Sequence, residues 1–173
     1  MSESYMEMEY TAPLPDFSRV ALAGTFQLGG RACRLEISPI RRFPDYGPDY
    51  DVVQCRVLLG DQPLTLADLN PRLSVAECYH LWSDLCAALQ EAVRTVYALP
   101  ATEEGAPNPR LGCWGHRPDL RGQGESDCYI ALVLGVAVDT RPAGRRPSQV
   151  QVARALAAAL LAALRRWEAA ARA

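Results

Sequence analysis

The chain has 173 residues, of which 49% are hydrophobic and 22% charged, and its formal net charge is −2. This composition excludes general disorder and is typical of a single globular domain that buries roughly 70% of its unfolded surface. The pI of about 5.7 disfavours nucleic-acid binding, and the absence of lysine excludes a Gly-Lys-Ser/Thr phosphate-binding loop.

The first 16 residues form an acidic segment that ends in two prolines. Its acidic residues, which no basic residue accompanies, are Glu3, Glu7, Glu9 and Asp16. We expect residues 1–16 to be a tail, although the alternation of Glu and Met within it also permits a short strand. Residues 17–173 contain no long linker and are expected to form one domain.

A hairpin is expected next. Apolar residues from Val20 to Leu28 lead into Gly29-Gly30, a sequence typical of a tight turn between two strands. From Cys33 to Ser38, apolar and polar residues alternate. Half of this hairpin is therefore expected to face water.

Residues 39–51 contain three prolines and a glycine, which disfavour regular pairing and predict a protruding loop. Alternation resumes between Val52 and Leu58 and predicts a third strand. Gly60-Asp61 then predicts a turn, and Leu64 with Leu66 permits a short fourth strand.

Two long helices are expected, and each is expected to begin at a capping box. Ser74 and Glu77 have the spacing of the first box, and apolar residues follow at helical spacing until Pro100. Ser148 and Gln151 have the spacing of the second, directly after a proline. The apolar stripe of the last helix is formed by Val152, Leu156, Leu160 and Leu164.

The segment from Tyr129 to Val138 is an apolar run without strict alternation, which predicts a strand buried on both faces in the middle of a sheet. Residues 111–114 are expected to form another strand. The order is thus strands, helix, strands, helix. This order predicts an α+β fold in which an antiparallel sheet of five to six strands carries two long helices on one face.

The chain contains six cysteines and no Cys-x-x-Cys pair; they are Cys33, Cys55, Cys78, Cys86, Cys113 and Cys128. We expect small buried thiols in a reducing compartment, and therefore a cytoplasmic protein. The acidic N-terminus does not resemble a secretory signal, and the apolar runs do not predict membrane insertion.

Cys113 and His116 are close in sequence and could form a nucleophile and base or half of a metal site. Nothing in the spacing brings further ligands to them, so we expect structural roles, no metal, no cofactor and no catalytic residue. The alternative is an enzyme of unrecognised type that uses both residues beside residues 117–126.

Aromatic and acidic residues are concentrated at the end of the proline-rich loop: Phe43, Asp45, Tyr46, Asp49, Tyr50 and Asp51. This composition predicts a protein-binding surface, because rings provide contact area and carboxylates steer a basic partner. The alternative is that Phe43 and one tyrosine pack back onto the sheet. A calcium or magnesium site is disfavoured, because the spacing lacks the distal glutamate of a calcium loop.

Charge is unevenly distributed along the chain. Residues 1–104 hold 15 acids and 8 arginines, a balance of −7, whereas residues 105–173 hold 5 acids and 10 arginines, a balance of +5. Arg141, Arg145 and Arg146 precede the last helix, where a solvated loop is a better interpretation than nucleic-acid contact.

The order of these features resembles the small immunity proteins of the WapI type, which accompany bacterial polymorphic toxins. The resemblance extends over most of residues 19–167, from the strand at 33–38 and the Pro-Asp loop to the closing helix. It implies a protein that binds and blocks a toxin and has no catalytic residue. Residues 111–116 and the alanine-rich ending depart from that pattern.

The sequence therefore favours a non-enzymatic binding protein, most concretely an immunity-like inhibitor of a basic protein such as a nuclease toxin. The acidic loop, helped by the glutamates of the tail, would form the contact. An adaptor subunit of a larger assembly fits the same features. The oligomeric state is left open.

Overall fold

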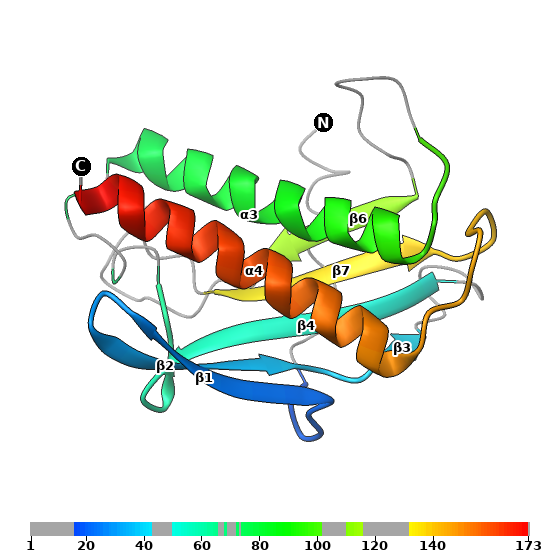
Figure 1. Ribbon diagram of the computed structural model, residues 1–173, viewed down its shortest axis with the longest axis horizontal. Helices are drawn as coiled ribbons and strands as arrows, with labels where there is room; N and C mark the ends of the chain where they lie inside the picture. Colours follow the sequence, from blue (N-terminus) through cyan, green and yellow to red (C-terminus); the bar gives the residue numbers. More distant parts are fainter. Residues whose placement is uncertain are drawn as a thin grey trace, which may run out of the picture.

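The computed structural model describes residues 16–42, 50–65, 68, 72, 74–101, 110–115 and 132–172 (Figure 1). Within these ranges the chain forms seven strands and two long helices. In chain order they are β1 (Leu22–Leu28), β2 (Arg31–Ile37), β3 (Arg41–Arg42), β4 (Tyr50–Leu59), β5 (Gln62–Pro63), α3 (Val75–Val96), β6 (Leu111–Gly115), β7 (Val133–Asp139) and α4 (Gln149–Arg172).

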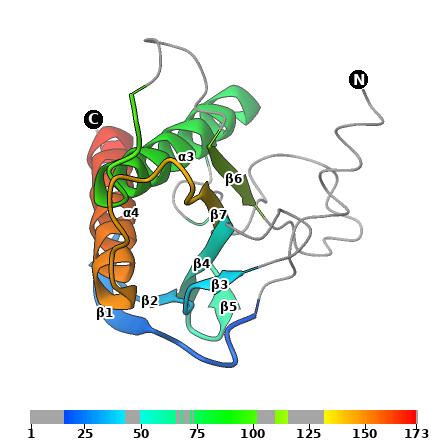
Figure 2. The same cartoon turned by 90° about the vertical axis from the view of Figure 1, so that its right-hand side faces the viewer.

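The strands form one sheet in the order β1-β2-β4-β7-β6, and every pairing in it is antiparallel. The two-residue strands β3 and β5 both pair with β4 outside this order, which brings the sheet to seven strands rather than the five to six expected. Helices α3 and α4 lie side by side on the same face of the sheet (Figures 1 and 2). The predicted α+β class is confirmed.

The hairpin of β1 and β2 forms as expected from its glycines. Gly29 and Gly30 have φ angles of 58° and 76°, and Leu28 pairs directly with Arg31 across them. Positive φ at both central residues is the geometry of a type I′ turn, which matches the twist of the flanking strands.

The valine-rich strand predicted around residues 129–138 is also confirmed. In the described part of this segment, β7 begins at Val133, and all seven of its residues are buried. It pairs with β4 on one side and with β6 on the other. It is the fourth strand of the main order, and the middle position belongs to β4.

Both helices begin at the capping boxes that the sequence predicts. The Ser74 hydroxyl accepts a hydrogen bond of 3.1 Å from the amide of Glu77, whose carboxylate accepts one of 3.4 Å from the Ser74 amide. Ser148 and Gln151 exchange the same pair of bonds, at 3.2 and 2.7 Å, ahead of α4. Each cap stabilises its helix by about 1 kcal/mol.

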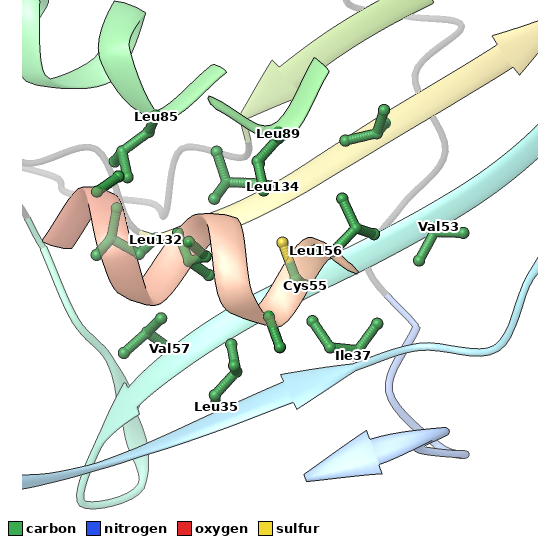
Figure 3. Packing of buried hydrophobic residues seen from close by; sticks show 14 of the residues in the cluster. Leu35, Ile37, Val53, Cys55, Val57, Leu85, Leu89, Leu132, Leu134 and Leu156 are labelled. Atoms are coloured by element: carbon green, nitrogen blue, oxygen red, sulfur yellow. The ribbon is translucent and has the colours of Figure 1, made fainter. Parts of the chain in front are cut away.

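The hydrophobic core lies between the sheet and the two helices (Figure 3). Leu85 and Leu89 of α3 and Leu156 of α4 are fully buried and point toward the sheet. The side chains that they meet alternate along the strands, so they share one face; they include Leu35, Ile37, Val53, Cys55, Val57 and Leu134.

Neither α3 nor α4, in the part of the chain that the structure describes, is long and apolar enough to pass through a bilayer.

Candidate functional site

The loop predicted to bind a partner joins two strands that pair with each other. Phe43, Asp45, Tyr46 and Asp49 lie outside the described residues. On either side of them, Arg42 of β3 pairs with Asp51 of β4. The described residues on either side of 43–49 therefore lie at the same end of the sheet.

Asp51 anchors the end of this loop to the helix layer. Its side chain is only 10% exposed, and its carboxylate accepts a hydrogen bond of 2.8 Å from the hydroxyl of Tyr97, at the end of α3. Burial, together with the adjacent carboxylate, raises the pKa of Tyr97 well above its usual range. Arg146 approaches the same carboxylate at 3.8 Å. Asp51 thus faces inward, while Tyr50 is half-buried.

Asp139 lies beside this position, because it pairs with Tyr50. Its side chain is fully buried and accepts bonds of 2.9 and 2.8 Å from the Nε and Nη2 of Arg141, one of 3.1 Å from the Arg141 amide, and one of 3.1 Å from Arg110. The hydrogen bonds from Arg141 and the charges of both arginines outweigh burial and lower the pKa of Asp139 to about 2.

Five exposed arginines surround these two aspartates. Arg110 and Arg141 bond to Asp139, and Arg146 approaches Asp51. Arg145 donates to the Thr95 carbonyl, and Arg42 pairs with Asp51 in register. We call Arg42, Arg110, Arg141, Arg145 and Arg146 the arginine rim. The acidic and basic halves of the sequence therefore meet in space at this end of the sheet.

A second set of charged groups lies on the sheet face opposite the helices. Glu36 is 7% exposed and accepts bonds from Arg34 at 3.1 Å and from Arg56 at 2.6 Å. Burial raises the pKa of Glu36, but the two guanidinium groups outweigh it and lower the pKa on balance. The ring of Phe17 lies 4.3 Å from the Arg56 guanidinium.

This buried charge corrects one expectation from the sequence. The alternation along β2 correctly separates Leu35 from its charged neighbours, but the polar side of the hairpin does not simply face water, because Glu36 and Ser38 are buried. Further along the same face, Gln54 is fully buried and accepts bonds from Arg41 at 2.9 Å and from the Asp16 amide at 3.2 Å.

Cys113 lies against α3 in surroundings that disfavour its thiolate. A hydrogen bond with the Cys86 thiol, then burial and the proximity of Cys86 and Cys55, raise the pKa of Cys113 far above its usual range. A nucleophilic cysteine needs a lowered pKa. His116, the other member of the suggested dyad, lies outside the described residues.

Of the remaining cysteines, Cys128 lies outside the described residues, and the other four divide into two groups. Cys33, Cys55 and Cys86 are free thiols, as is Cys113. Cys78 is disulfide-bonded, which corrects the expectation of a free thiol at this position. Among the described residues, no three histidine, cysteine or acidic side chains converge in a geometry that could hold a metal ion.

Comparison with known proteins identifies no relative: no protein-family model matches the chain, and no curated protein or solved structure is significantly similar to it.

Proposed function

We propose that this chain is a non-enzymatic protein-binding module whose contact surface combines residues 43–51 with the arginine rim. The supporting observation is that both ends of the loop belong to paired strands, one of them held to α3 by the bond between Tyr97 and Asp51. A loop on a rigid base loses less entropy on binding than a free one does.

The proposed partner is a protein whose surface carries charges of both signs. Asp45 and Asp49 supply the acidic charge that attracts basic groups, as an inhibitor of a basic toxin requires. The arginine rim adds donors for carboxylates, because Arg110, Arg141 and Arg146 have side chains that are 48, 60 and 58% exposed. Asp51 acts as an anchor within this surface.

The role that this surface fits best is that of an immunity-like inhibitor, in keeping with the resemblance to WapI-type proteins. An adaptor subunit would use the same surface and differ only in the identity of its partner. A catalytic role for Cys113 lacks support, because its thiol has a raised pKa.

The test measures binding to the product of the neighbouring gene by calorimetry at two salt concentrations. The double variant Asp45→Asn/Asp49→Asn is expected to raise Kd about tenfold and to reduce the salt dependence. Asp61, in the turn that follows β4, and Asp84, in the middle of α3, are exposed, so Asp61→Asn/Asp84→Asn removes the same charge as a matched control. Equal affinity of the two double variants would refute the role of the loop.

We propose the cytoplasm as the location, because four of the described cysteines are free thiols. The Cys78 disulfide argues the other way and therefore provides a direct test. In a reducing compartment this bond would be open, and alkylation of the denatured protein without reductant would label all six cysteines. Labelling of only four cysteines in protein taken from its native cells would place it in an oxidising compartment.

A further inference from the structure

The outer edge of β1 has properties that the binding surface does not explain. β1 is the first strand of the sheet order, and among the described strands it pairs with β2 alone (Figure 1). Its seven residues, Leu-Ala-Gly-Thr-Phe-Gln-Leu, contain no charge and no proline. Their register with β2 is unbroken from Leu22 to Leu28, so no bulge interrupts the edge.

The hairpin geometry determines which backbone groups point outward. In a two-residue hairpin, the residues next to the turn form a hydrogen-bonded pair, and such pairs alternate along the ladder. Leu28 therefore bonds to β2, as does every second residue before it. The N–H and C=O groups of Ala23, Thr25 and Gln27 point away from β2, and all three residues are exposed. No hydrogen bond joins these outward groups to any residue within the described ranges.

Sheet edges of this kind are normally protected. Proteins place lysine or other charges, prolines, bulges or covering segments on an exposed edge, because unpaired backbone groups are a template for another strand. β1 has none of the first three, although its length of about 24 Å exceeds that of a typical protected edge. Only another extended strand can match its pattern of donors and acceptors.

We propose that the outer edge of β1 pairs antiparallel with the same edge of a second copy of this chain. A two-fold axis at Thr25 places Ala23 opposite Gln27 of the second copy and leaves no like charges facing each other. The half-buried side chains of Leu22 and Phe26, which pack against the core, then continue into the core of the second copy.

The position of α4 adds to the case for a second copy. α4 packs over β1 and β2. Two valines are exposed in this region: Val150 in the first turn of α4, at 50%, and Val20 before β1, at 38%. A two-fold axis perpendicular to the sheet keeps both helix layers on one side and brings the two α4 helices alongside each other. The formal charge of −2 opposes such pairing only weakly. An interface centred on one short strand is small, so the dimer is expected to be weak and dependent on concentration.

Sedimentation velocity of the full chain over a series of concentrations tests this proposal. The wild type is expected to pass from monomer to dimer. Thr25→Pro removes one outward N–H, a change that edge strands tolerate, and is expected to raise the dimer Kd about tenfold. Thr25→Val retains the N–H and the branched Cβ and is expected to keep the wild-type Kd. A wild type that is monomeric throughout, or a Thr25→Pro variant that dimerises equally well, would overturn the proposal.

A second variant keeps the test decisive if Thr25→Pro does not fold. Thr25→Lys places two ammonium groups together at the two-fold axis, so dimerisation is expected to weaken at low salt and to recover partly at high salt. Dimerisation that is insensitive to this charge would contradict pairing at β1. Because β1 lies outside residues 43–51 and the arginine rim, neither result bears on the proposed binding function.

Discussion

The two faces of the sheet are both largely buried, but they are stabilised in different ways. The face toward α3 and α4 is mainly apolar, and the side chains at its centre, such as Ile37, Val57 and Leu134, are fully buried (Figure 3). The opposite face includes Glu36, Gln54 and Asp139, each buried and each bonded to arginine. The first face is stabilised by burial of apolar surface area, whereas the buried polar groups of the second need a complete set of hydrogen-bond and charge partners.

This difference predicts how each face responds to change. An apolar face loses stability in proportion to the volume removed, and its neighbours can partly repack. When a buried charged group loses one partner, no repacking can compensate, because the group that remains keeps its full desolvation cost. Substitutions on each face test this contrast, from the largest expected effect to the smallest.

Truncation of the helix layer is expected to have the largest effect. Leu85→Ala removes a fully buried side chain and is expected to lower the free energy of unfolding by about 3 kcal/mol. Urea denaturation followed by circular dichroism measures this loss. Leu161→Ala, at a partly exposed position of α4, is the matched control and should cost less than half as much. Equal costs would show that the apolar face lacks the packing described.

Removal of one charge on the opposite face is expected to cost less. Asp139→Asn keeps the shape of the side chain but removes the charge that holds Arg110 and Arg141, and should lower the free energy of unfolding by about 2 kcal/mol. The same denaturation experiment measures it. Asp61→Asn, at an exposed turn, should have almost no effect. If Asp139→Asn were equally silent, the opposite face would not depend on its ion pairs.

The elements that the sequence predicted correctly carry local signals. The Gly29-Gly30 turn, the two capping boxes and the apolar run of β7 each follow from a few neighbouring residues. The predicted fold class follows from their order alone. In each case the physical cause lies within the segment, such as a positive φ or an unpaired helix amide.

The features that the sequence could not predict depend on distant partners. The sequence pattern groups Asp51 with the loop, but the environment of its side chain comes from Tyr97 at the end of α3 and from Arg146, 46 and 95 positions further along the chain. Alternation along β2 shows that Glu36 shares a face with Arg34, but not whether this face is buried. The loop residues Phe43, Asp45, Tyr46 and Asp49 remain predictions.

Lowering the pH tests the contribution of Asp139 on the face opposite the helices. The pKa of Asp139 is lowered to about 2 in the folded state, against an ordinary value near 3.9, so its charge stabilises the fold above about pH 4. This contribution is lost as the pH falls from 4 to 2 and the carboxylate binds a proton. The difference in unfolding free energy between wild type and Asp139→Asn should therefore shrink over this range. A difference that is constant down to pH 2 would contradict the lowered pKa.

The smallest expected effect concerns the hydrogen bond between Tyr97 and Asp51, which ties the end of the binding loop to the helix layer. Tyr97→Phe removes the hydroxyl that donates to Asp51 but keeps the buried ring, so the free energy of unfolding should fall by about 1 kcal/mol. If this bond acts through Asp51, adding Asp51→Asn to Tyr97→Phe should cost less than the sum of the two single changes. Hydrogen exchange at Tyr50 and Asp51 should accelerate in Tyr97→Phe, while exchange at the centre of β7 should not, because the lost bond lies at the root of the loop. Strictly additive costs, or uniform acceleration over the whole sheet, would show that Tyr97 stabilises the fold only as a core residue and does not hold the loop in place.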